Sequence, residues 1–184
     1  WVNLFVGGEA EASFGGIPVK AEVETRFPFE GKVKLALTAE KEAKGTIRLR
    51  IPSYASEISL SCDGKTVTAE AGSYAKIPFE GTKKEITLSF VMPPHFVYAN
   101  PKVRADAGKV AVKRGPLVYC MEQADNGENL SNLFVDTTVE PVVTYESGLL
   151  GGTDVIRLSG KRMDAEAWSS DALYAEKRVP LKET

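Results

Sequence analysis

The sequence predicts an all-β protein built from two consecutive antiparallel β-sandwich domains. Apolar and polar residues alternate along many short stretches, which is the pattern of half-buried strands. Turn-forming residues separate these stretches about every 8 to 12 residues, as in β-sandwiches, and no window is convincingly helical. A Pro-Pro pair near the middle of the chain divides the strands into two sets, so we expect domains at residues 1–93 and 94–184.

The first expected element is a tight hairpin in "GGEAEASFGG", residues 7–16. Paired glycines stand at both ends of this segment, but it does not match a phosphate-binding fingerprint, and no helix follows it to present N–H groups to an anion. Alternation then predicts strands in "KVKLAL", residues 32–37, and in "TIRLRI", residues 46–51.

Two further strands of the first domain are expected in "EISLSC", residues 57–62, and in "KEITLSF", residues 84–90. Asp63-Gly64 suits a two-residue type I′ turn, because both central positions of that turn need positive φ. Glu30-Gly31 and Glu80-Gly81 are expected to separate strands in the same way. In total, about eight strands precede the Pro-Pro pair.

The boundary between the domains falls in "VMPPHF", residues 91–96, because neither Pro93 nor Pro94 has an N–H to donate to a central strand. About six strand-like runs follow, interrupted by the polar loop "ADNGENLSN" at 124–132. Residues 161–173 can form at most one short turn or helix. The sequence contains no recognisable internal repeat.

Composition excludes several classes of protein. The chain has 184 residues, 43% of them hydrophobic and 26% charged, which is enough apolar material for a sizeable core. A net charge of −2 argues against nucleic-acid binding, which needs a basic surface. No apolar run reaches the roughly 20 residues of a membrane helix. Two cysteines without CxxC spacing form neither a disulfide framework nor a zinc site.

The first residues, "WVNLFVGG", include no Met and no signal-peptide pattern, and the last residues, "RVPLKET", are equally abrupt. We therefore expect the chain to be a piece of a longer protein. The compartment of that protein stays open, because either a cytoplasmic or an exported parent fits these observations.

Isolated reactive residues give weak signals. His95 is the only histidine and is expected to be a linker or interface residue, since a multi-histidine metal site is impossible. Cys62 and Cys120 are expected to be unpaired, buried thiols, because free cysteine is commonly a small apolar core residue. A nucleophilic cysteine needs an orienting base, and the one histidine lies 25 positions before Cys120, across an expected turn.

Acidic residues give no recognisable pair. A glycosidase needs two carboxylates across one sugar bond. The spacing of the acidic residues does not select such a pair. We expect the candidates to lie at solvated strand ends and turns; they are Asp106, Glu122, Asp125, Asp154 and Asp164. Residues 125–129, "DNGEN", lack a calcium-loop pattern and suggest a turn on Asn126-Gly127. Asn129-Leu130-Ser131 is a lone glycosylation sequon.

Several aromatic residues are candidates for stacking on the apolar faces of sugars, although packing inside or between the domains is favoured for most of them. The candidates are Trp1, Tyr54, Tyr74, Phe96, Tyr98 and Trp168. From the residues alone, no catalytic, cofactor-binding or metal-binding residue is assigned.

The segment "VRADAGKVAVKRGPLVYCMEQADN", residues 103–126, resembles the C-terminal region of the β-L-arabinofuranosidase family, glycoside hydrolase family 127. In that family a segment of this form begins the second of two β-sandwich domains. Residues 4–10, "LFVGGEA", resemble the strand that follows the family's helical barrel. "VETRFPFEGKVKLAL" and "LRIPSYA" resemble further family segments, although Phe27, Phe29 and Ser53-Tyr54 depart from the usual residues.

The resemblance implies that the chemistry lies elsewhere. Family members have an N-terminal (α/α)6 barrel in which a zinc-bound cysteine is the nucleophile and a glutamate assists. Neither cysteine of this chain matches that motif, so no catalytic residue, metal ligand or cofactor is carried over, and zinc is expected only in the barrel domain.

Within residues 103–126, the resemblance implies two strands. Val110 and Val112, then Val118 and Cys120, are expected to point inward, and residues 114–116 to connect them. Arg104, Asp106 and Glu122 are expected to be the polar surroundings of these strands.

Two functions follow. The first is a non-catalytic accessory region that buttresses the barrel domain; the second is a carbohydrate-binding module. The barrel domain is therefore the expected partner, with carbohydrate as a second candidate and with neither nucleic acid nor membrane. The family's aromatic final strand is not reached by residue 184, so self-association through an open sheet edge is also expected.

Overall fold

The computed structural model describes residues 1–168, 171 and 173–184. Every sheet in the described part of the chain is antiparallel, and the helical elements are single short turns, which confirms the all-β prediction. The chain divides into two compact units, Trp1–Pro93 and Pro94–Thr184, here called unit 1 and unit 2.

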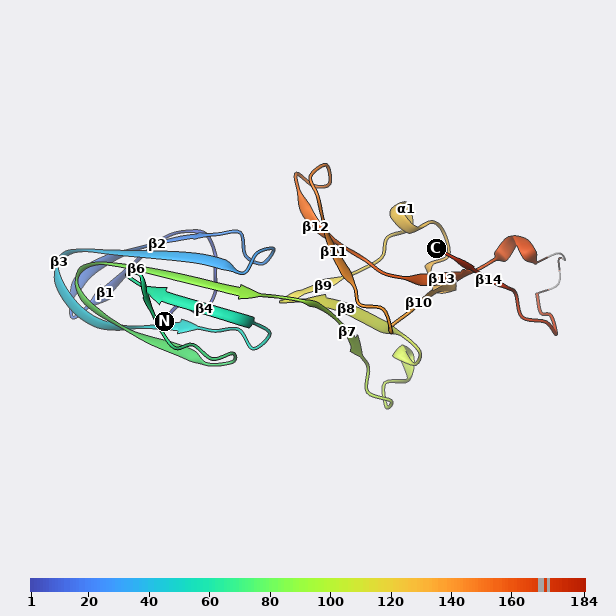
Figure 1. The fold of residues 1–184 in the computed structure, drawn as a ribbon, viewed down its shortest axis with the longest axis horizontal. Helices are drawn as coiled ribbons and strands as arrows, with labels where there is room; N and C mark the ends of the chain where they lie inside the picture. Colours follow the sequence, from blue (N-terminus) through green and yellow to red (C-terminus); the bar gives the residue numbers. More distant parts are fainter. Residues whose placement is uncertain (169–170, 172) are drawn as a thin grey trace. The chain divides into compact units, whose positions relative to one another are not determined.

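Unit 1 contains one six-stranded sheet with the strand order β1-β2-β3-β6-β4-β5. Two of its strands, β3 and β6, are much longer than the others and pair with each other along most of their length (Figure 1). The strands are β1 (Gly8–Phe14), β2 (Ile17–Thr25), β3 (Lys32–Arg50), β4 (Ser56–Cys62), β5 (Lys65–Thr66) and β6 (Tyr74–Val91).

The sheet of unit 1 bends sharply and folds over itself, because both long strands curve at the same place (Figure 1). Their register shifts between Thr38 and Ala43, so β3 contains extra residues opposite β6. On β6 the bend lies at Gly81, whose φ of 101° disfavours a side chain. The sandwich is therefore two layers of one continuous sheet.

Because the long strands bend instead of ending, unit 1 contains fewer strands than the sequence predicted. Glu80-Gly81 was expected to separate two strands, and that prediction is wrong because the ladder with β3 continues through both residues. Likewise, "KVKLAL" and "TIRLRI" belong to the single strand β3. Two pairs of expected strands are thus merged, and unit 1 has six strands instead of about eight.

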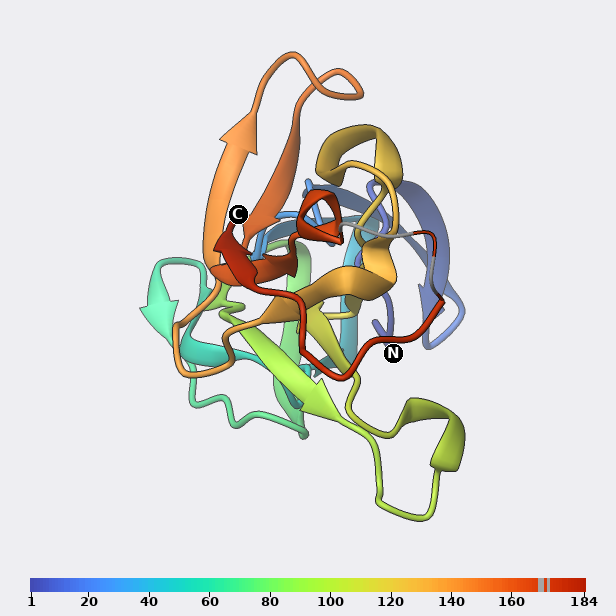
Figure 2. The same cartoon turned by 90° about the vertical axis from the view of Figure 1, so that its right-hand side faces the viewer.

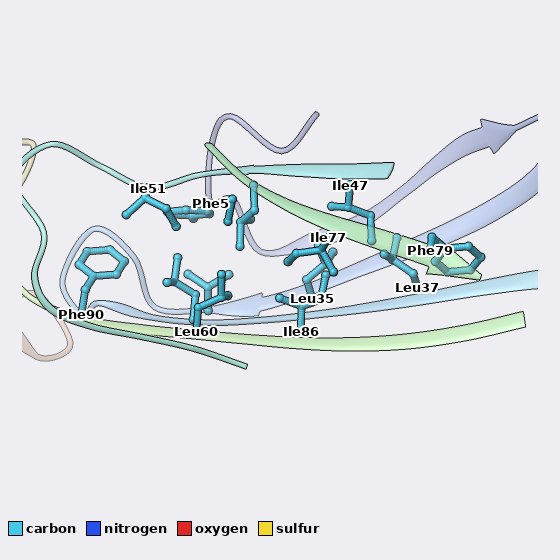
Figure 3. Close-up of a cluster of buried hydrophobic side chains, with 14 of the residues drawn as sticks. Phe5, Leu35, Leu37, Ile47, Ile51, Leu60, Ile77, Phe79, Ile86 and Phe90 are labelled. Atoms are coloured by element: carbon cyan, nitrogen blue, oxygen red, sulfur yellow. The ribbon is translucent and has the colours of Figure 1, made fainter. Parts of the chain in front are cut away.

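The core of unit 1 lies between the two layers. Ile47 and Ile77 point from one layer toward Leu35 and Ile86 on the other (Figure 3). Phe79 is completely buried at the end of this cluster. The alternation of apolar residues read from the sequence is therefore the alternation of inward-facing side chains.

Two turns in unit 1 match their sequence signals. Gly15-Gly16 joins β1 to β2 with φ values of 58° and 83°, so the glycine-rich segment is a hairpin. Asp63-Gly64 joins β4 to β5 with φ values of 48° and 76°, as a type I′ turn requires. Both predictions are confirmed.

Unit 2 consists of three small antiparallel sheets, with the strand orders β7-β8-β9, β10-β13-β14 and β11-β12. In Figure 2 the β11–β12 hairpin (orange) extends away from the other strands of this unit. The strands are β7 (Pro94–Tyr98), β8 (Val110–Arg114), β9 (Leu117–Tyr119), β10 (Leu133–Val135), β11 (Val142–Glu146), β12 (Thr153–Arg157), β13 (Gly160–Met163) and β14 (Leu181–Glu183).

Short helical turns connect the strands of unit 2. They are η1 (Arg104–Asp106), α1 (Gln123–Asn126), η2 (Leu130–Asn132) and η3 (Ala165–Ala167). The range 161–173, expected to form at most a short turn or helix, contains the end of β13 and the turn η3; its residues 169, 170 and 172 lie outside the described residues. Pro94 begins β7, an edge strand, where a missing N–H is tolerated.

The expected inward face of β9 is wrong. Val118 is 69% exposed, and Cys120 is exposed just beyond the end of the strand. Gly115-Pro116 forms a two-residue turn that sets Val112 opposite Tyr119. Because directly opposed residues share a face, Tyr119 takes the side of the buried Val112, and Val118 takes the other side.

Candidate functional site

An aromatic cluster on unit 1 is the first candidate site. A parallel bridge places the N-terminal segment beside β3: Val2 N–H donates to the Arg48 carbonyl at 2.8 Å, and Arg50 N–H donates to the Val2 carbonyl at 3.0 Å. Trp1 is thereby held over β3. The Arg48 guanidinium carbon lies 4.7 Å from the centre of the Trp1 ring, within the range of a cation–π contact.

Tyr74 completes this cluster. Its ring meets Trp1 edge-on, with centroids 5.0 Å apart and an interplanar angle of 78°. The Tyr74 hydroxyl donates to Asn3 Oδ1 at 3.0 Å, which fixes the ring. Trp1 remains 73% exposed, so part of the indole can contact a ligand. We call Trp1, Arg48 and Tyr74 the aromatic platform.

The remaining aromatic candidates do not extend the platform. Tyr54 is half-buried and packs against the core of unit 1. Tyr98 is exposed, whereas Phe96 and Trp168 are half-buried, and all three belong to unit 2. Of these six candidates, Trp1 and Tyr74 are in ring-to-ring contact with each other.

Three of the five acidic candidates, all in unit 2, lie beside cations. Asp154 Oδ2 lies 2.8 Å from Arg114 Nη1, and both side chains are mostly covered. Asp164 lies 3.1 Å from Lys182 Nζ. Asp106 faces Lys109 at 4.0 Å on the surface. All three carboxylates are therefore engaged with basic side chains.

Glu122 and Asp125 are exposed at the start of α1, and Arg104 is exposed in η1. The Arg114–Asp154 pair links the β8–β9 turn to β12, two segments that are distant in the sequence. The sequence predicted residues 114–116 as a connection between two strands but gave no signal for Asp154 as the partner of Arg114.

The polar loop at 124–132 is held by Arg162, a residue that sequence reasoning did not select. Its guanidinium donates to the backbone carbonyls of Asn126 and Glu128, the latter at 2.6 Å. Asn126 ends α1, and Gly127 follows at a φ of 76°, so the expected turn on these two residues is present. Asn129, the residue of the sequon, is exposed.

The cysteines and the histidine are dispersed. Cys62 is half-buried at the end of β4, and Cys120 is exposed, so the expectation of two buried thiols is wrong for Cys120. Both are unpaired, as predicted. His95 is exposed on β7, opposite Lys113. Over residues 1–168, 171 and 173–184, no three His, Cys, Asp or Glu side chains gather where they could hold a metal ion.

No helix of the described chain is long and apolar enough to cross a membrane.

Comparison with known proteins places both units in one family. Residues 1–92 match the family model described as the GH127 middle domain of β-L-arabinofuranosidase, and residues 94–169 match the glycoside hydrolase family 127 C-terminal domain. The two units are thus the β-rich domains of a glycoside hydrolase family. The chain belongs to glycoside hydrolase family 127.

Individual relatives agree with the family match. The chain is 35% identical to the non-reducing end β-L-arabinofuranosidase of Bifidobacterium longum subsp. longum, over 97% of this chain and 28% of that protein. It is similar to the crystal structure of a GH127 β-L-arabinofuranosidase from Geobacillus stearothermophilus T6, with a TM-score of 0.84 and 36% identity over 98% of this chain and 29% of that one.

A second solved structure, a GH127 β-arabinofuranosidase, matches with a TM-score of 0.79 and 29% identity over 100% of this chain and 30% of that one. The chain therefore spans less than a third of the length of these relatives. The resemblance drawn from residues 103–126 and the segments before them is confirmed.

Proposed function

We propose that this chain is a non-catalytic accessory region that packs against a helical-barrel catalytic domain of a β-L-arabinofuranosidase-like enzyme. The observation that carries the proposal is an uncovered apolar segment at the start of unit 1. Trp1 is 73% exposed, and Leu4 and Val6 are each 70% exposed, next to the fully buried core of the same unit. Adjacent exposed apolar side chains of this kind favour a protein–protein contact.

The chemistry of the described residues supports the same proposal. Asp106, Asp154 and Asp164 lie beside cations. The zinc that the family resemblance implies has no fitting set of ligands in the described residues. We therefore assign this chain no step of the reaction.

The test uses the full-length protein with the two changes Leu4→Asp and Val6→Asp. Burying carboxylates in an apolar contact is costly, so we expect a lower melting temperature and reduced activity on an aryl β-L-arabinofuranoside. Leu150→Asp is the matched control, since Leu150 is 89% exposed in unit 2. If Leu4 and Val6 tolerate the carboxylates as well as Leu150 does, the proposed contact is wrong.

The aromatic platform favours a second function, carbohydrate binding. An exposed indole backed by Arg48 and Tyr74 offers a rigid surface for the apolar face of a sugar. Depletion of the chain from solution by insoluble arabinan or arabinogalactan measures this binding. Trp1→Ala is expected to abolish it, while Trp168→Ala leaves it unchanged; no depletion of the unmodified chain contradicts the second function.

A further inference from the structure

A cavity of about 270 Å³ opens at one edge of unit 1. One wall comes from the β4–β5 hairpin and the residue that follows β5, and another from the first half of β6. The lining residues are Cys62, Asp63, Lys65, Val67, Lys76, Ile77, Pro78 and Lys84. The cavity exists because β6 bends, which brings residues 76–78 of one layer near the hairpin of the other.

The one carboxylate of the cavity is already neutralised. Asp63 Oδ1 accepts the Glu85 N–H at 2.9 Å, and Asp63 Oδ2 lies 2.9 Å from Lys84 Nζ. The backbone N–H and then the Lys84 ammonium lower the pKa of Asp63, and the same carboxylate raises the pKa of Lys84. Asp63 therefore offers little charge to a ligand.

Two further lysines leave the cavity positive. Lys65 and Lys76 both line it, and neither takes part in an ion pair with another described residue. Cations beside a concave apolar surface attract an anion that also has an apolar part. Val67 and Pro78 supply that apolar surface.

The backbone of β6 favours a small ligand over an added strand. Ile51 N–H donates to the Ser73 carbonyl, and Ile51 and Ser73 continue the ladder of β3 and β6. Alternation along an antiparallel ladder then turns the backbone groups of Lys76 and Pro78 toward the open edge. Pro78 has no N–H, so this edge cannot support a regular new strand.

We propose that this cavity binds a small carboxylate-bearing ligand with an apolar ring face, the chemistry of a uronic acid monosaccharide. Its carboxylate is held by Lys65 and Lys76, and its ring lies against Val67 and Pro78. The volume, slightly below the range of about 300–1,000 Å³ for larger small-molecule sites, suits one sugar unit. This site does not depend on the accessory role, and it adjoins the aromatic platform, because Lys76 is the ladder partner of Arg48.

Cys62 is a built-in reporter for the site, because it lines the cavity and is half-buried. Burial, and then the neighbouring Asp63, raise the pKa of the Cys62 thiol, so we expect it to react slowly with thiol reagents. In a Cys120→Ser background, Cys62 is the only thiol left. A ligand in the cavity must slow its modification further.

The experiment measures the rate of Cys62 modification by a neutral aromatic disulfide reagent during titrations with three probes. Galacturonate is expected to slow the reaction saturably. Galactose, which lacks the carboxylate, leaves the rate unchanged, and sulfate, which lacks the ring, protects only weakly. The double variant Lys65→Gln/Lys76→Gln weakens protection by galacturonate about tenfold, the loss of two exposed ion pairs.

The double variant Lys41→Gln/Lys83→Gln is the matched control, because both lysines are exposed and neither lines the cavity. It is expected to keep full protection. Circular dichroism verifies that both double variants are folded. The proposal is overturned if galacturonate gives no saturable protection, if galactose or sulfate protects equally well, or if the two double variants behave alike.

Discussion

Gly45 is a sharp test of how the folded sheet closes. It lies in the second half of β3, and Phe14 at the end of β1 reaches over it to contact Phe79 at a centroid distance of 5.1 Å. A Cβ atom at Gly45 would lie 2.7 Å from Cγ and Cδ1 of Phe14. We therefore predict that Gly45→Ala destabilises unit 1 only while Phe14 is present.

The magnitude follows from two opposing effects. Overpacking a well-packed site costs about 1–3 kcal/mol. Replacing glycine inside a strand with alanine returns about 0.5–1 kcal/mol, so the net loss is about 1–2 kcal/mol. With Phe14→Ala in place the clash is gone, and Gly45→Ala should be neutral or slightly stabilising. The coupling energy between the two positions is then about 2 kcal/mol.

Urea unfolding measures this coupling through Trp1 fluorescence in a Trp168→Phe background, where the signal reports on unit 1 alone. The four proteins of the double-mutant cycle supply the free energies of unfolding. Independent sites add to within about 0.3–0.5 kcal/mol. If the effects of the two substitutions add within that margin, Phe14 does not cover Gly45 and the described closure of the sheet is incorrect.

Four further outcomes are expected. Asp154→Asn leaves the mostly covered Arg114 guanidinium without its carboxylate and lowers the free energy of unfolding of unit 2 by about 2–3 kcal/mol in urea titrations; an unchanged midpoint contradicts this. Folding lowers the pKa of Asp63. The ionised Asp63 carboxylate therefore stabilises the folded state above about pH 4, and this stabilisation is lost as the pH falls through the lowered pKa. The Asp63→Asn variant, about 1 kcal/mol less stable at neutral pH, should therefore converge with the unmodified chain in acid, and a constant difference would refute the assignment. Thiol titration of the native chain should find Cys120 reacting promptly and Cys62 slowly, since Cys120 is exposed and burial raises the pKa of Cys62; equal rates would contradict the different environments. Self-association through a sheet edge of unit 1 is checked by light scattering over a dilution series, where a monomer mass at every concentration argues against it.

Period-2 alternation predicted the strands of unit 1 well, because one face of its sheet is buried in a large core. Ile47, Leu49, Ile86 and Leu88 are all buried, as their spacing required. The bend at Gly81 could not be predicted, since a glycine with positive φ serves a hairpin turn and a strand bend equally well. Only the distant partner strand β3 decides between them.

The alternation of apolar and polar residues predicted the strand faces of unit 2 less well, because unit 2 has little buried apolar core. Val112 is its one buried large apolar residue among those described, so alternation there carries little information about an inward face. The phase of β9 was nevertheless readable from Gly115-Pro116, a two-residue turn that fixes which residues face each other. The aromatic platform and the cavity combine residues from distant strands, and sequence spacing has no means to show such meetings.

The bend of unit 1 also has a consequence for the order in which its strands pair during folding. Arg50 pairs with Tyr74 at one end of the long ladder, and Lys32 pairs with Ser89 at the other. The chain between Arg50 and Tyr74 closes the shorter loop, so pairing at that end loses less entropy than pairing at the far end. Pairing that extends from that end passes through the bend, so the same ladder joins both layers of unit 1. With so many distant pairings, unit 1 is expected to fold in milliseconds to seconds.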